Sequence, residues 1–105
     1  MSSPGLEIPR ENVAEFCRRW RIVELSLFGS VLREDFRADS DVDLLVTFAP
    51  DADWSLLDHV TMEEEMAALL DRKVDLVSRP AVERSENHIR RKAILESAIP
   101  CYVAG

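Results

Sequence analysis

The sequence predicts one α/β domain in which helices pack on a small mixed β-sheet. Its 105 residues suit a single domain, residues 1–105, and 47% of them are hydrophobic, which is enough for one modest core. Segments with apolar residues at helical spacing alternate with short apolar segments that end in turn-forming residues. The resulting order, helix–strand–helix–strand–helix–strand–helix, is typical of a layered α/β or α+β fold.

The first predicted elements are a helix, a strand and a short second helix. The spacing of apolar residues predicts a helix over about residues 9–20. Ile22–Phe28 is short, apolar and partly alternating, so it predicts a strand, and Gly29 ends that strand. A short helix is then expected from Val31, followed by a turn. This link allows the next strand to run back beside the first.

Three further strands are expected, at Val42–Phe48, Lys73–Ser78 and Ile99–Val103. The last of them is expected at a sheet edge, because Pro100 cannot donate a backbone hydrogen bond to a neighbouring strand. Its place at the edge would leave the other strands to form the centre of the sheet.

Two more helices separate these strands. A long helix begins after Asp53 or Ser55, since either side chain can cap it. The residues expected on its buried face are Leu56, Val60, Ala67 and Leu70, and Glu63 falls on the same face without an explanation. After a break at Arg79-Pro80, the last helix is expected to run through Ile89, Ala93 and Ile94 to about Ser97.

Composition and charge narrow the class of protein. The formal net charge of −7 argues against a simple nucleic-acid-binding protein, which normally has a basic face, so direct nucleic-acid binding is not expected. No segment has the length of a membrane span and the N-terminal residues do not resemble a signal peptide, so the cytoplasm is the expected location. Cys17 and Cys101 lie far apart in sequence, and in a reducing compartment they are expected to be free thiols.

Three aspartates are placed as a metal site would require. Asp41 and Asp43 open the second strand and, because side chains alternate along a strand, they point to the same face. Asp75 lies between apolar residues inside the third strand, where an unpaired carboxylate is costly. A divalent cation would remove the mutual repulsion of these acids, and Mg²⁺ binds through one or two carboxylates together with substrate phosphates.

Gly29 and Ser30 supply the other half of a nucleotide site. Glycine has no Cβ, so the backbone at Gly29 can approach a ligand closely. Ser30 offers a hydroxyl and stands at the expected start of a helix, where backbone N–H groups bind phosphate. Carboxylates for a metal on one side and a phosphate site on the other indicate a nucleoside triphosphate as the ligand.

These residues resemble the minimal nucleotidyltransferase family of the polymerase-beta superfamily. The resemblance rests on Gly29-Ser30, ten intervening residues, Asp41-x-Asp43, and Asp75 in a later strand. It is closest over GSVLREDFRADSDVDLLV, where Arg33 also matches, and it extends over nearly the whole chain. It implies the polymerase-beta-like fold, with Asp41, Asp43 and Asp75 as catalytic metal ligands. It also implies that Gly29, Ser30 and Arg33 bind the nucleotide.

The resemblance further implies an activity and a partner. Members of this family often act as antitoxins to a HEPN-domain ribonuclease toxin and transfer AMP from ATP onto a tyrosine of that toxin. The expected cofactors are Mg²⁺, as two ions, and ATP as the nucleotide donor, and the expected assembly is a hetero-oligomer with the toxin. Two residues depart from the family pattern. Leu32 stands where a small residue is common and Glu34 where glycine is common, which bears on the shape of the phosphate site.

A second function remains open, in which the protein is a non-catalytic antitoxin that neutralises its partner by binding alone. A Gly-Ser pair ends many strands and Asp-x-Asp is often a turn or a helix cap, so each motif alone is weak. The presence of all three carboxylates together with the Gly-Ser pair favours the enzyme. An RNA or small-molecule acceptor is disfavoured by the short chain and its acidic charge.

Overall fold

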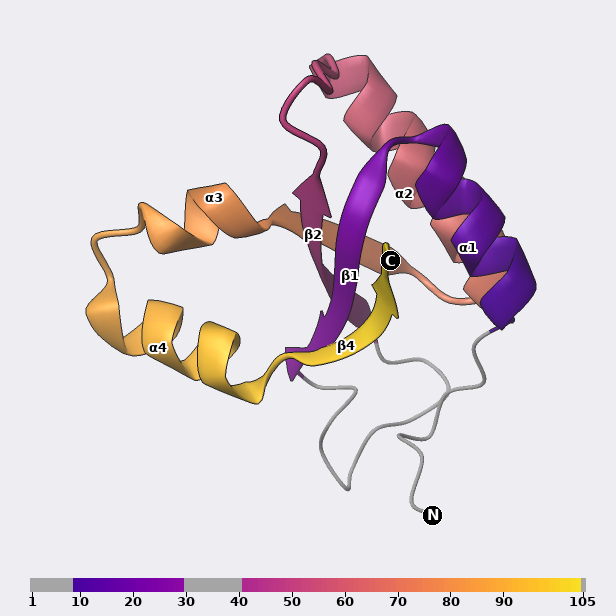
Figure 1. The fold of residues 1–105 in the computed structure, drawn as a ribbon. Coiled ribbons are helices and arrows are strands. Elements are labelled where there is room, and N and C mark those ends of the chain that lie inside the picture. The colour runs from indigo at the N-terminus through magenta and orange to yellow at the C-terminus, as the bar shows by residue number, and fades with distance from the viewer. Residues whose placement is uncertain (1–8, 30–40, 105) are drawn as a thin grey trace.

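The computed structural model describes residues 9–29 and 41–104, and its strands form one mixed sheet with helices on both faces (Figure 1). The strands are β1 (Ile22–Phe28), β2 (Val42–Phe48), β3 (Val74–Ser78) and β4 (Ile99–Val103). The helices are α1 (Arg10–Arg19), α2 (Leu56–Leu70), α3 (Arg79–Glu83) and α4 (His88–Ser97). The predicted fold class, a small mixed sheet with helices packed on it, is confirmed.

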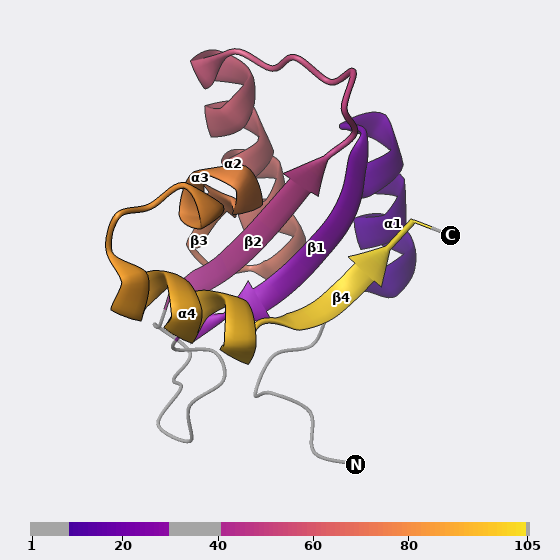
Figure 2. The same cartoon turned by 60° about the vertical axis from the view of Figure 1, so that its left-hand side comes forward.

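The strands lie in the order β3-β2-β1-β4 across the sheet (Figure 2). β1 is antiparallel to both of its neighbours, β2 and β4, whereas β3 runs parallel to β2. The parallel pair requires a long connection, which α2 provides. The C-terminal end of β1 and the N-terminal end of β2 therefore meet at the same end of the sheet, as the sequence predicted.

The larger core lies between one face of the sheet and helices α1 and α2 (Figure 1). Alternate residues of the central strands point into it, because side chains alternate between the faces of a sheet. Its buried members from the sheet are Ile22, Leu25, Leu27, Val42, Leu44, Val46, Val74 and Leu76. The helices add Val13, Phe16, Cys17, Met62, Met66 and Leu70.

A smaller core lies on the other face, beneath α3 and α4. Phe28 and Leu45 of the sheet pack there against Val82 of α3 and Ile94 of α4. Val77, Leu95 and Ala98 lie at its margin and are partly buried. Because this cluster is small, the rest of that sheet face remains available to polar side chains.

Local sequence explains where α2 begins and ends. Ser55 accepts a hydrogen bond from the backbone N–H of Asp58, and the Asp58 carboxylate accepts one from the N–H of Ser55, which together form a capping box. Ser55 is therefore the cap, and Asp53 is not. The helix ends at Asp71, whose φ of 53° lies in the left-handed region that closes many helices.

The predicted buried face of this helix was wrong at two of its four positions. Leu56 and Val60 are 82% and 42% exposed, whereas Met62 and Met66 are buried together with the correctly predicted Leu70. The pattern counted apolar residues only. In the structure, α2 turns a different face toward the sheet from the one predicted. That face includes the polar side chains of His59 and Glu63, which contact β3.

The segment after β3 also differs from the prediction. Pro80 lies in the first turn of the short helix α3, where a backbone N–H would have no hydrogen-bond partner within the helix. Proline is therefore tolerated there, and the segment forms a helix where only a break was expected. The helix α4 then starts at His88, and of the apolar residues expected along it, only Ile94 is buried, while Ile89 is 85% exposed. The helix predicted from Val31 lies outside the described residues.

The two cysteines are free thiols, with Cys17 buried in α1 and Cys101 half-buried in β4. Burial raises the pKa of Cys17 to about 12 and that of Cys101 to about 11. Within residues 9–29 and 41–104, no helix has both the length and the apolar character needed to cross a bilayer.

Candidate active site

Gly29 and Asp43 are in direct contact at the end of the sheet where β1 stops. Phe28 is paired with Asp43 across the antiparallel ladder, so the next residue, Gly29, turns over the Asp43 side chain. A Cβ at Gly29 would clash with Oδ2 of Asp43, and the φ of Gly29 is +76°. Both the close approach of the carboxylate and the positive φ disfavour a side chain at this position, which accounts for the glycine.

Asp75 lies beside Asp43 on the neighbouring strand. The parallel register pairs the two residues directly, and adjacent strands are about 4.8 Å apart. Their neighbours along the strands, Val42, Leu44 and Leu76, point into the core under α1 and α2. Asp43 and Asp75 therefore share the opposite face of the sheet, beside the cluster under α3 and α4.

Asp41 completes the predicted set of acids. It directly precedes β2 and stands two residues before Asp43. Asp41 and Asp75 are exposed and Asp43 is half-buried, so a ligand from solvent has access to all three. In the described part of the chain, no three His, Cys, Asp or Glu side chains are close enough together to form a complete protein metal site.

The arrangement fits Mg²⁺ bound together with a nucleotide. Mg²⁺ keeps several waters and commonly takes only one or two protein carboxylates, with substrate phosphates supplying further oxygens, so it needs no complete protein cage. Asp41 and Asp43 are candidates to hold it, with Asp75 directly beside them. The Gly29 backbone lies against the Asp43 carboxylate, because glycine has no side chain to keep the two apart.

A protein-family model for the nucleotidyltransferase domain matches residues 10–101. The chain belongs to the nucleotidyltransferase domain family. The match spans β1 to β3, with Gly29, Asp41, Asp43 and Asp75 within it. The resemblance noted from the sequence is thereby confirmed, and the end of the sheet where Gly29 meets Asp43 is the candidate active site of this nucleotidyltransferase.

Individual relatives agree with the family. Protein adenylyltransferase MntA of Thermococcus cleftensis is 40% identical over 68 residues, which cover 65% of this chain and 67% of the relative. The solved structure of a protein proposed to be a minimal nucleotidyltransferase is 38% identical, covers 87% of both chains and has a TM-score of 0.65. A second solved structure contains a tri-AMPylated HEPN toxin of Shewanella oneidensis in complex with an MNT antitoxin. It shares the fold, with 20% identity, a TM-score of 0.59, and coverage of 90% of this chain and 70% of that chain.

Two residues predicted to bind the nucleotide, Ser30 and Arg33, lie outside the described residues. Leu32 and Glu34, the departures from the family pattern, lie in the same segment. The structure therefore brings together Gly29, Asp43 and Asp75, and places Asp41 at the adjacent strand end.

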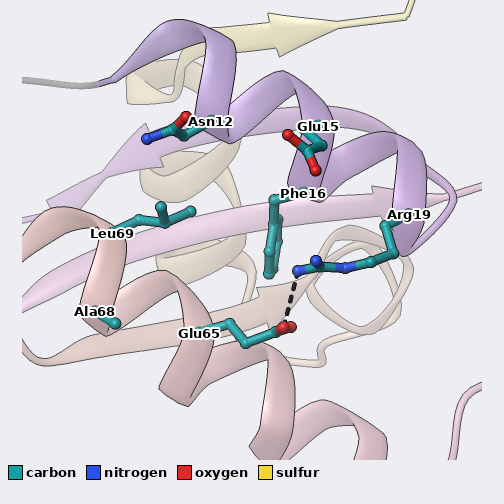
Figure 3. Close-up of a pocket in the computed structure, with 7 residues that line it drawn as sticks. All are labelled: Asn12, Glu15, Phe16, Arg19, Glu65, Ala68 and Leu69. Atoms are coloured by element: carbon teal, nitrogen blue, oxygen red, sulfur yellow. Dashed lines mark hydrogen bonds and ion pairs between the residues drawn. The ribbon is translucent and has the colours of Figure 1, made fainter.

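A groove elsewhere on the nucleotidyltransferase lies between α1 and α2 (Figure 3). It has a volume of about 390 Å³, and an ion pair of 2.8 Å between Arg19 and Glu65 spans it. Its lining residues are Asn12, Glu15, Phe16, Arg19, Glu65, Ala68 and Leu69. These helices cover the sheet face opposite to Asp43 and Asp75, so the groove is separate from the candidate active site.

Sequence reasoning missed two residues that contact the strand holding Asp75. Glu63 of α2 accepts a hydrogen bond of 2.9 Å from the backbone N–H of Leu76. Nε2 of His59 lies 2.9 Å from the backbone oxygen of Leu76. The only sequence signal was the position of Glu63 on a face that otherwise appeared apolar.

Proposed function

We propose that this nucleotidyltransferase transfers AMP from ATP, in a Mg²⁺-dependent reaction, onto a tyrosine of a HEPN-domain ribonuclease toxin. The observation that carries the proposal is the contact of Gly29 with Asp43 and the pairing of Asp43 with Asp75 at one end of the sheet. Membership of the nucleotidyltransferase family and the similarity to a protein adenylyltransferase support the reaction type. The HEPN partner is supported by the fold shared with a chain of the toxin–antitoxin structure.

In the proposed reaction, the tyrosine oxygen attacks the α-phosphorus of ATP. A bond forms between that oxygen and phosphorus, the bond to the bridging oxygen of the β-phosphate breaks, and pyrophosphate leaves. The phenol proton passes to water or to a neighbouring carboxylate. Bound Mg²⁺ would stabilise the charge on the phosphate oxygens and on the leaving group.

The chain's own residues have defined roles in this scheme. Asp41 and Asp43 hold the metal, and Asp75 is a third acid that supports it. Gly29 lets the phosphates approach the backbone, while Ser30 and Arg33 contribute further phosphate contacts. The partner contributes the acceptor, and its docking on this chain makes the attack effectively intramolecular. The bulk and charge of an added AMP at the active site of a ribonuclease would oppose entry of the RNA phosphates.

The test uses the partner expected from the neighbouring reading frame, a small helical protein with an Arg-x4–6-His motif. After incubation of that protein with this chain, ATP and Mg²⁺, intact-mass measurement should show one or more added AMP units, with loss of ribonuclease activity. The Asp41→Asn, Asp43→Asn double variant should add none. If this variant still neutralises the partner fully at equal stoichiometry, the antitoxin acts by binding alone and the enzymatic proposal is wrong.

A further inference from the structure

The strand that holds Asp75 is an edge strand whose outer side faces α2. β3 pairs only with β2 in the described sheet, and in a parallel pair alternate residues bond the neighbouring strand. The backbone N–H of Val42 donates to the oxygen of Lys73 at 2.9 Å, so residues 73 and 75 face β2. The N–H and C=O groups of Leu76 consequently point away from the sheet.

Two side chains of α2 bind both of these outward groups. Glu63 accepts the Leu76 N–H at 2.9 Å, and Nε2 of His59 donates to the Leu76 oxygen at 2.9 Å, because a carbonyl can only accept. His59 and Glu63 are four residues apart, one helical turn, so they share one face of α2. Both side chains are half-buried in a helix that otherwise buries methionine and leucine toward the sheet.

These bonds act on the peptide group next to Asp75. The N–H of Leu76 belongs to the same planar unit as the carbonyl of Asp75. On one side the ladder with β2 holds this unit, and on the other side Glu63 holds it. With the peptide held on both sides, the Cα–Cβ bond of Asp75 keeps its direction relative to Asp43.

We propose that Glu63 and His59 are positioning residues that hold Asp75 beside Asp43 for binding of the metal and nucleotide. This inference rests on the proposed function, since it assigns Asp75 to that site. General protection of a sheet edge needs only a covering side chain or a charge. Here the carboxylate of Glu63 and the imidazole of His59 bind both backbone groups of the residue that follows Asp75. Such precision matters at a reacting site, because a displacement of about 1 Å there can lower the rate about a hundredfold.

The test compares three variants of the full chain. Glu63→Leu removes the bond, Glu63→Gln keeps an acceptor oxygen, and Glu64→Leu is the matched control, since Glu64 is the exposed neighbour on the same helix. Three quantities are measured for each: hydrogen exchange of the Leu76 amide, affinity for Mn²⁺ with a non-hydrolysable ATP analogue, and kcat and KM for AMP transfer to the partner. The first two need no acceptor protein.

Loss of the Glu63 bond should be visible in all three quantities. In Glu63→Leu the Leu76 amide should exchange faster, and Mn²⁺ affinity and kcat should each fall by about 10–100-fold, with KM for the partner unchanged. Glu63→Gln should stay within about threefold of wild type, because its amide oxygen accepts the same hydrogen bond. Glu64→Leu should match wild type. If Glu63→Leu lowers only the melting temperature and leaves Mn²⁺ affinity and kcat equal to those of the control, Glu63 and His59 protect the edge of the sheet and do not position Asp75.

A double-variant cycle shows whether Glu63 acts through Asp75. In an Asp75→Asn background, Glu63→Leu should cause no further loss of Mn²⁺ affinity, whereas additive losses would overturn the proposal. If Glu63→Leu does not fold, His59→Ala, which removes one bond only, replaces it in the same cycle. If wild type transfers no AMP yet the cycle behaves as expected, the proposed function fails and the positioning role stands. If wild type transfers AMP and the cycle is additive, the positioning role alone fails.

Discussion

Oδ2 of Asp43 lies so close to Gly29 that a Cβ atom on Gly29 would clash with it. The carboxylate thus fills the space that any other residue's side chain would need. Gly29 and the strand residue Asp43, with thirteen residues between them in the sequence, thereby pack directly against one another. The antiparallel pairing of Phe28 with Asp43 creates this contact.

Replacement of Gly29 by alanine should therefore disturb the site. We expect Gly29→Ala to lower the melting temperature, because the left-handed backbone angle alone costs about 1–2 kcal/mol for a residue with a Cβ. The new methyl group also displaces the Asp43 carboxylate, so calorimetry should show at least a tenfold weaker binding of ATP–Mg²⁺. In an Asp43→Ala background the clash disappears, so Gly29→Ala should lower stability only by the cost of the left-handed backbone angle. Undiminished binding in Gly29→Ala would place the phosphate site elsewhere.

The cap of α2 can be tested separately from the site. Ser55→Ala removes the oxygen that accepts the N–H of Asp58 and should lower stability by about 1 kcal/mol, or roughly 4–8 °C in melting temperature. Transfer activity at 25 °C should be unchanged, because the folded population stays high. Asp53→Ala, at the other candidate cap, is the control and should have no such effect. Equal losses in the two variants would show that the capping box does not stabilise this helix.

The strands could be predicted from the sequence because each is a short apolar segment with a clear stop. Val42–Phe48 and Ile22–Phe28 are found with the predicted bounds. The buried face of α2 could not be predicted, because that helix satisfies the backbone of an edge strand with His59 and Glu63. Apolar periodicity contains no information about such polar contacts.

The candidate site could be predicted from the sequence only in part. Gly29 and Asp43 were expected at one end of the sheet on the condition that the second strand runs back beside the first, and the structure shows that it does. The pairing of Asp43 with Asp75 depends on a parallel register set by the crossover through α2, which is a non-local property. The sequence showed an acid inside a strand, and only the fold shows which residue stands beside it.

The buried thiol of Cys17 makes a prediction about alkaline pH. Burial raises its pKa from the ordinary 9.0 to about 12, with a smaller contribution from Cys101. Above pH 9 the unfolded chain loses this proton while the folded chain retains it, so the stabilising effect is complete below pH 9 and is lost as pH rises toward 12. Melting temperature should fall over this range, and less steeply in Cys17→Ala. Native protein at pH 8 should react with iodoacetamide on the order of a hundredfold more slowly than unfolded protein. Fast native labelling of Cys17 would contradict its burial.

The pairing of Asp43 with Asp75 predicts how stability depends on metal. Two carboxylates on adjacent strands repel each other, by an amount on the order of 1 kcal/mol for groups open to solvent. Without metal, Asp75→Asn should therefore raise the melting temperature by a few degrees. Wild-type protein should gain stability when Mg²⁺ is added, and more when ATP accompanies it, because a ligand that binds only the folded state shifts the equilibrium toward that state. Asp75→Asn should lose most of this gain.

A charge-matched variant distinguishes a local effect from a change in net charge. Asp53 is exposed and precedes α2, outside the acid cluster, so Asp53→Asn removes the same charge at another place. Its melting temperature should respond to Mg²⁺ and to ATP–Mg²⁺ as wild type does, measured by calorimetry with EDTA as the metal-free reference. If Asp53→Asn and Asp75→Asn lose the Mg²⁺ response equally, the ion acts by screening the chain's charge of −7. The same response in wild type and Asp75→Asn would remove Asp75 from the metal site and leave Asp41 and Asp43 as its candidate ligands.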